Sequence, residues 1–174
     1  MKQIFYSITF FTVLLLSCVG VAEENLSSVQ FVAAYETVRP GERLPVAVKI
    51  TVADGWHTYA KEPGDSGMPP SIKLSGVDGL DVSEWRFPPP ETFTDSVGTS
   101  YGYEHQVVLL SDVLVPDTVP VGDTIALTAS IKWMICKDAC VFQKDAQTII
   151  VQSGAVSSEP SAEWLSLLKE SGWE

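Results

Sequence analysis

Residues 124–151 form the sequence Thr124-Ile-Ala-Leu-Thr-Ala-Ser-Ile-Lys-Trp-Met-Ile-Cys-Lys-Asp-Ala-Cys-Val-Phe-Gln-Lys-Asp-Ala-Gln-Thr-Ile-Ile-Val151. Apolar residues lie on both sides of Cys136-Lys-Asp-Ala-Cys140, as in two paired strands. Four residues of extended strand span about 13 Å, whereas the Cα atoms of a disulfide lie roughly 4.4 to 6.8 Å apart, so the backbone must reverse if the cysteines bond. We therefore predict a β-hairpin with a three-residue loop, Lys137-Asp-Ala139, and facing cysteines.

The rest of the chain shows a similar strand pattern. Short runs rich in Val, Ile, Thr and aromatic residues are broken about every ten residues by Gly, Pro and Asp, which is typical of an all-β sandwich. The strands are expected at residues 29–36, 43–52, 57–60, 70–74, 80–87, 105–115, 124–135 and 141–151.

Two segments rich in proline and glycine interrupt this pattern. Residues 61–70 are expected to form a loop, and residues 88–102 a stiff proline-rich start that leads into a mobile stretch. After Gly154, a Ser/Pro linker leads to a short amphipathic helix that Ser161 caps and whose apolar face holds Trp164, Leu165 and Leu168. The linker and helix occupy residues 154–174.

The amino terminus predicts export from the cytoplasm. Lys2 precedes an apolar run over residues 4–16, which is too short to span a bilayer and has the length of a secretory signal. Small residues Gly20 and Ala22 indicate a signal peptide over residues 1–22 and a mature domain over residues 23–153. Alternatively, residues 15–18 resemble a lipoprotein box, in which Cys18 would carry a lipid anchor.

The mature chain is acidic. It retains 10 basic and 22 acidic residues, because the signal segment holds one of the 11 basic residues and no acidic one. Such a charge disfavours nucleic acid and anionic lipid as partners, and no basic patch is evident along the sequence.

The close spacing of Cys136 and Cys140 favours a reactive disulfide over a structural one. Closing so small a ring stabilises a fold by only about 2 kcal/mol in the chain-entropy model, against roughly 4.7 kcal/mol for a ring of about 100 residues. A closely spaced pair at an accessible turn is better suited to opening and closing by thiol exchange.

Further segments carry a family resemblance. The segments Asp54-Gly-Trp-His-Thr-Tyr-Ala-Lys61, Gly64-Asp-Ser-Gly-Met-Pro-Pro70 and Tyr101-Gly-Tyr-Glu104, with Trp85 and the stretch from Trp133 to Cys140, occur in this order. Together they resemble the amino-terminal periplasmic domain of the thiol:disulfide interchange protein DsbD.

This resemblance implies an immunoglobulin-like β-sandwich and a periplasmic oxidoreductase component that needs no cofactor or metal. Its two cysteines would take electrons from a membrane-embedded thiol reductase of the DsbD/CcdA type and pass them to thioredoxin-like periplasmic proteins. Cys140 would form the mixed disulfide and Cys136 would resolve it. An aromatic-bearing loop caps the cysteines in this family, which makes Phe93 in residues 91–100 the candidate cap, with Tyr101 and Tyr103 alongside. Trp133 is the tryptophan expected to shield the cysteines.

The chain also departs from the family pattern. The best-known members separate the two cysteines by more residues than the three found here, and they continue into a membrane portion and a thioredoxin-like domain. This chain is therefore expected to act as a free-standing relay.

Two other functions remain open from the sequence. A Cys-x-x-x-Cys pair also suits Cu(I) in a metallochaperone, with His57, His105, Met68 and Met134 as possible further ligands. The sandwich could instead be a non-catalytic binding module in which the disulfide is structural.

Overall fold

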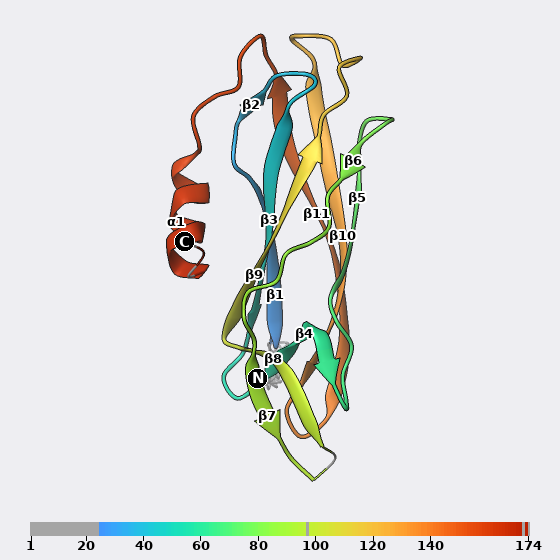
Figure 1. Ribbon diagram of the computed structural model, residues 1–174, viewed down its shortest axis with the longest axis vertical. Helices are drawn as coiled ribbons and strands as arrows, with labels where there is room; N and C mark the ends of the chain where they lie inside the picture. Colours follow the sequence, from blue (N-terminus) through green and yellow to red (C-terminus); the bar gives the residue numbers. More distant parts are fainter. Residues whose placement is uncertain (1–24, 97, 172, 174) are drawn as a thin grey trace, which may run out of the picture.

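The computed structural model describes residues 25–96, 98–171 and 173, and it shows two β-sheets packed face to face with one helix on the outside (Figure 1). The expected signal peptide and Cys18 lie outside the described residues. The smaller sheet has the order β1 (Ser27–Ala33), β3 (Arg43–Val52), β9 (Gln106–Leu114) and β6 (Asp81–Val82). The fold is an immunoglobulin-like β-sandwich, as predicted.

The second sheet has seven strands and carries the hairpin. Its order is β2 (Thr37–Val38), β11 (Cys140–Ser153), β10 (Thr124–Cys136), β4 (His57–Gly64), β8 (Thr99–Glu104) and β7 (Glu91–Thr94). The seventh strand, β5 (Ser71–Ser75), also pairs with β10.

Strand alternation builds the core between the two sheets. In β10, every second residue points inward, because successive side chains of a strand point to opposite faces. These inward residues pack against aliphatic residues of β3 and β9. The buried residues include Ile125, Leu127, Ala129, Ile131 and Trp133 of β10, Val46, Val48 and Ile50 of β3, and Leu109 and Val113 of β9.

The hairpin has the predicted geometry. Strands β10 and β11 pair in antiparallel register along their length, and the last pair in this register is Cys136 with Cys140. The loop therefore contains Lys137, Asp138 and Ala139, as the cysteine spacing predicted.

The segment expected to be a mobile stretch instead forms a second hairpin. Strands β7 and β8 pair from Glu91 with Gly102 to Thr94 with Thr99. The turn closes where the Asp95 amide donates to the Gly98 carbonyl at 3.0 Å. Threonine and aromatic residues after the prolines provide a pleated surface, so the prolines precede the hairpin rather than prevent it.

One expected strand and one expected loop are shorter than the sequence predicted. The strand expected at residues 80–87 is reduced to β6 and an isolated bridge between Arg86 and Leu110. The first loop is shorter than expected, because β4 continues to Gly64 across a register shift after Tyr59.

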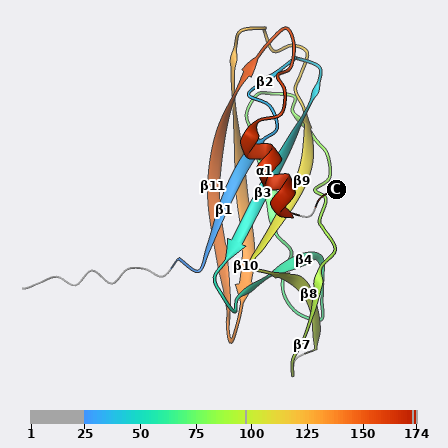
Figure 2. The same cartoon turned by 90° about the vertical axis from the view of Figure 1, so that its left-hand side faces the viewer.

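The helix α1 (Ala162–Ser171) covers the outer face of the smaller sheet (Figure 2). The Ser161 hydroxyl accepts a hydrogen bond from the Trp164 amide at 3.1 Å, which confirms the predicted cap. Trp164 and Leu167 are buried against β1, β3 and β9, whereas Leu165 is 49% exposed rather than part of the apolar face. Among the described residues, no helix has the length and apolar character needed to cross a membrane.

Candidate functional site

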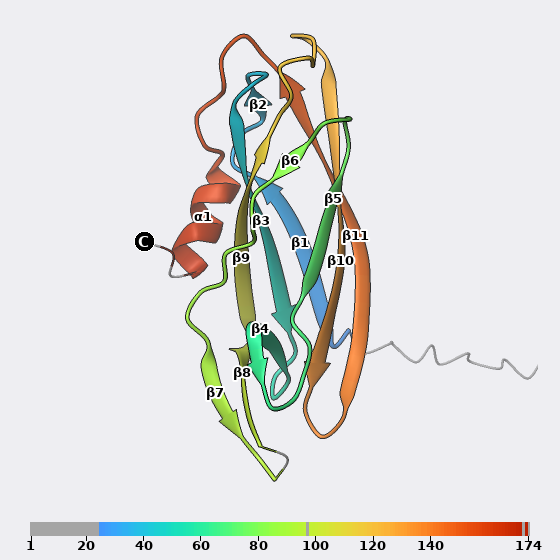
Figure 3. The ribbon, with the colours of Figure 1, turned by 45° about the vertical axis from the view of Figure 1, so that its right-hand side comes forward.

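The site lies at one end of the sandwich, where the β10–β11 hairpin turns (Figure 3). Cys136 and Cys140 form a disulfide, and their Cα atoms are 4.1 Å apart. Cys136 is only 4% exposed, while Cys140 is exposed at the start of β11. The bond is therefore accessible from the Cys140 side.

Strand β4 supplies the side chains next to the disulfide. In the pairing of β4 with β10, His57 lies opposite Cys136. Alternation then puts His57 and Tyr59 on the same outer face as Cys136 and Met134. Tyr59, Met134 and Cys136 form a small buried cluster that is separate from the main core.

Tyr59 is an aromatic residue that lies beside the exposed sulfur. Its hydroxyl oxygen lies 3.9 Å from Cys140 Sγ. Burial raises the pKa of the Tyr59 hydroxyl above its ordinary value. A hydrogen bond with Ser66 lowers this pKa in part, and the negative charge of Asp95 raises it further. The hydroxyl thus stays protonated and can donate a hydrogen bond to a thiolate on Cys140.

His57 and then Phe93 continue the series of ring contacts from Tyr59, away from the sulfur. The Phe93 ring stacks on the His57 ring with centroids 4.6 Å apart, and His57 meets Tyr59 edge to face at 5.2 Å. Burial lowers the pKa of His57, although Glu104 and Asp95 partly oppose this. Phe93, His57 and Tyr59 thus form a continuous aromatic row that ends at Cys140.

Two backbone segments hold this row in place. The Asp65 amide donates to the Thr99 carbonyl at 2.9 Å, and the Thr99 amide donates to the Asp65 carboxylate at 2.9 Å. These bonds tie the segment after β4 to the β7–β8 hairpin. Gly67 in that segment lies so close to the Tyr59 ring that a Cβ there would be 2.1 Å from it. The Tyr59 ring is therefore packed between the Gly67 backbone on one side and Met134 and Cys136 of β10 on the other.

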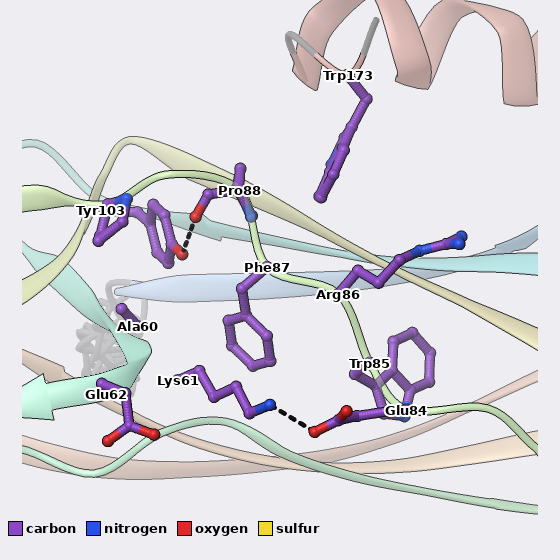
Figure 4. A pocket seen from close by; sticks show the side chains of 11 residues that line it. Ala60, Lys61, Glu62, Glu84, Trp85, Arg86, Phe87, Pro88, Tyr103 and Trp173 are labelled. Carbon is purple, nitrogen blue, oxygen red and sulfur yellow. Dashed lines mark hydrogen bonds and ion pairs between the residues drawn. The ribbon is translucent and has the colours of Figure 1, made fainter.

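Tyr101 and Tyr103 occupy different positions from Phe93. Tyr101 is 38% exposed on β8, whereas Tyr103 is buried in the main core. The Tyr103 hydroxyl donates to the Pro88 carbonyl at 2.8 Å, and burial raises its pKa to about 12. It borders a cavity of about 580 Å³ between β4, the segment before β7 and Trp173, whose edge carries the ion pair of Lys61 with Glu84 (Figure 4).

Trp133 lies in the main core, and its ring nitrogen donates to the Ser27 hydroxyl at 3.2 Å. Its neighbour Met134 points to the other face and packs with Cys136. The side chain that covers Cys136 on its own strand is therefore Met134, because residues an odd number of positions apart point to opposite faces.

The residues considered as copper ligands are only partly brought together. His57 lies opposite Cys136, and Met134 packs against Cys136. Met68, in contrast, is 51% exposed. His105 Nδ1 lies 3.7 Å from the Asp54 carboxylate. Within the part of the chain that the structure describes, no three His, Cys, Asp or Glu side chains gather as a metal site would require.

Tyr59 is the site residue that the sequence reasoning missed. The segment His57-Thr58-Tyr59 puts both rings on one strand face, and that pattern was visible. The pairing of this strand with the end of β10 was not visible, because it joins segments more than 70 residues apart.

The fold and the accessible disulfide define a thiol–disulfide exchange domain. The family described as "Thiol:disulfide interchange protein DsbD, N-terminal" matches residues 26–152, and the chain belongs to this family. Comparison with curated protein sequences finds no match.

One solved structure with a TM-score above 0.5 supports the fold. The N-terminal periplasmic domain of ScsB from Proteus mirabilis is 18% identical, with a TM-score of 0.64 over 84% of this chain and 53% of that chain. The chain thus spans about half of that structure. The N-terminal domain of Neisseria meningitidis DsbD in the reduced form is 18% identical, with a TM-score of 0.40 over 75% of this chain and 90% of that chain.

Proposed function

We propose that this domain is a periplasmic thiol–disulfide relay that works through a reversible Cys136–Cys140 bond. It accepts electrons from a membrane-embedded thiol reductase and passes them to oxidised thioredoxin-like proteins. The observation that carries this proposal is the asymmetry of the pair, in which an exposed Cys140 is joined to a buried Cys136 at the end of a hairpin.

The asymmetry assigns the two steps of the exchange. A donor thiolate attacks Cys140 Sγ, the bond to Cys136 breaks, and Cys136 leaves as a thiolate. The second donor thiolate then attacks the donor sulfur of the mixed disulfide and releases the Cys140 thiolate. The donor is oxidised by two electrons and the domain is reduced, while the thiolates take protons from water. Delivery to an acceptor follows the same steps in reverse.

Tyr59 is proposed to assist when Cys140 carries charge. Its protonated hydroxyl can move from 3.9 Å into full hydrogen-bond contact with a thiolate, which makes Cys140 a better leaving group. Tyr59 acts through the cysteine and is a positioning residue.

The aromatic row is proposed to cap the pair. Phe93 lies at the end of the β7–β8 hairpin, so a partner that displaces this hairpin also removes the stack on His57. The row thereby limits access of small oxidants to the Cys136 side of the reduced pair until a partner docks.

A purely structural disulfide fits the geometry less well. The hairpin is already held by antiparallel pairing from Thr124 to Cys136, so a ring of five residues adds little constraint. The large buried core of the fold also includes neither cysteine.

Trapping of mixed disulfides tests this proposal. Cys136→Ser leaves Cys140 without a resolving thiol, so it should retain its redox partners as mixed disulfides that mass spectrometry can identify. The matched variant Cys140→Ser should retain few or none, because Cys136 is buried. Equal trapping by both variants, or by neither, would contradict the proposed roles.

A further inference from the structure

The basic residues of this acidic chain divide into two groups. Within the described residues, five of them lie against a carboxylate: Arg39 with Glu42, Arg43 with Asp81, Lys49 with Glu170, Lys61 with Glu84, and Arg86 with Asp112. The structure shows no ion pair for the other five described basic residues, which are Lys73, Lys132, Lys137, Lys144 and Lys169. Four of these five lie on β5, β10, β11 or the hairpin loop.

Three of these lysines share one face of the seven-stranded sheet. Lys132 and Lys144 are direct partners across β10 and β11, and both are exposed. Lys73 of β5 pairs with Ser130, which is two residues before Lys132, so alternation puts its side chain on the same face.

The same face leads directly to the disulfide. The cross-strand pair after Lys132 and Lys144 on this face is Met134 with Phe142, and the next is Cys136 with Cys140. Phe142 is 69% exposed. Two residues of strand advance by about 7 Å, so the lysine pair lies roughly 13 Å from the cysteines, within the reach of one protein interface.

Folding alone does not account for this arrangement. Like charges directly opposite each other on paired strands destabilise a sheet, and a phenylalanine that is 69% exposed gains little from burial in the monomer. Both features become favourable when an anionic surface with an apolar patch covers them.

We propose that Lys73, Lys132, Lys144 and Phe142, here called the lysine face, dock a thioredoxin-like partner that carries carboxylates beside its reactive cysteines. This inference rests on the proposed exchange function and names the chemistry of its partner. The lysines attract the partner and set its orientation, and Phe142 anchors it beside Cys140. A protein is favoured over an anionic membrane, because a membrane on this face would cover the disulfide.

Two synthetic dithiol peptides test the charge preference. Both contain Cys-Gly-Pro-Cys, one flanked by glutamates and the other by lysines, and each reduces the oxidised domain under otherwise identical conditions. Each rate is divided by the rate of the same peptide with the uncharged hydroxyethyl disulfide, which removes differences in thiol reactivity. We expect the acidic peptide to react about tenfold faster at low salt, with most of this advantage lost at about 0.5 M NaCl.

Charge-reversal variants test whether the lysine face causes the preference for the acidic peptide. The double variant Lys132→Glu, Lys144→Glu should prefer the basic peptide. Lys169→Glu, on the helix at the other side of the sandwich, also adds negative charge and should keep the wild-type preference. Equal normalised rates for the two peptides, or an unchanged preference in the double variant, would overturn the proposal. Binding to phosphatidylglycerol vesicles without a peptide preference would overturn it as well, in favour of a membrane contact.

Reduction by uncharged dithiothreitol separates this inference from the function on which it rests. If dithiothreitol reduces the native domain but the charged peptides show no preference, the lysine face is wrong and the exchange function stands. If dithiothreitol cannot reduce the pair in the folded domain, both proposals fail.

Discussion

The Phe93 ring stacks on the His57 ring at a centroid distance of 4.6 Å and an angle of 15° between their planes. This contact joins the β7–β8 hairpin to the strand that lies beside Cys136. Any movement of the hairpin therefore changes the surroundings of the disulfide.

Loss of the Phe93 ring should make the reduced pair easier to oxidise. In Phe93→Ala, the stack on His57 is absent, so we expect glutathione disulfide to oxidise the reduced domain several-fold faster than it oxidises the wild type. Stopped-flow or quenched-flow alkylation measures this rate. Tyr101→Ala removes an exposed ring from the same hairpin and should leave the rate close to that of the wild type. An unchanged rate in Phe93→Ala would remove Phe93 from the cap.

The cap should weaken in mild acid. Burial lowers the pKa of His57 below its ordinary value of 6.5. The conformation with the Phe93 stack therefore favours the neutral imidazole, whereas the conformation in which His57 is exposed binds a proton more readily. The stabilisation by neutral His57 is complete above about pH 6.5 and is lost as the pH falls below that value.

This pH dependence has a direct measurement. Between pH 7.5 and pH 5, hydrogen exchange in the β7–β8 hairpin of the wild type should accelerate relative to that in His57→Phe, which keeps the stack but does not titrate. If the two proteins show the same pH dependence after correction for intrinsic exchange, protonation of His57 does not control the cap.

The Tyr59 hydroxyl should affect reactivity rather than packing. Tyr59→Phe retains the ring against Gly67 but removes the oxygen that lies 3.9 Å from Cys140 Sγ. We expect iodoacetamide to alkylate reduced Cys140 about threefold more slowly at neutral pH, since a charge-assisted hydrogen bond to the thiolate is lost. Tyr101→Phe is the matched control. The same alkylation rate in Tyr59→Phe and wild type would show that the hydroxyl is a bystander.

Stability and docking should respond in opposite directions at the lysine face. Lys144→Glu puts a carboxylate opposite Lys132, which should raise the free energy of unfolding by about 0.2 to 1 kcal/mol in urea titrations at low salt. Lys169→Glu removes a cation from the last turn of α1 and should lower stability instead. A destabilised Lys144→Glu would indicate that the two lysine side chains diverge.

Local patterns in the sequence were sufficient to predict the sandwich and the cysteine hairpin. The alternation on both sides of residues 136–140 determines the face of each side chain, and the cysteine spacing determines the chain reversal and the loop length. Ser161 likewise marks the start of the helix, because capping depends on neighbouring residues only.

The surroundings of the disulfide depend on pairings that local patterns do not show. His57 contacts Phe93 because β10, β4, β8 and β7 are neighbours in this order in the sheet, although they are distant in sequence. The lysine face was also hidden, since Lys73 is almost 60 residues from Lys132 and becomes its neighbour only through the pairing of β5 with β10. The position of Trp133, in contrast, follows from alternation alone, because it is three residues from Cys136.

A redox titration of the native domain tests the central claim most directly. The oxidised protein is equilibrated with mixtures of reduced and oxidised thioredoxin or glutathione, and the free thiols are counted by alkylation and mass spectrometry while circular dichroism monitors the fold. We predict a reversible two-electron transition above about −300 mV with the sandwich intact throughout. A disulfide that stays closed across these mixtures, or that opens only when the domain unfolds, would show that the bond is structural and contradict the account.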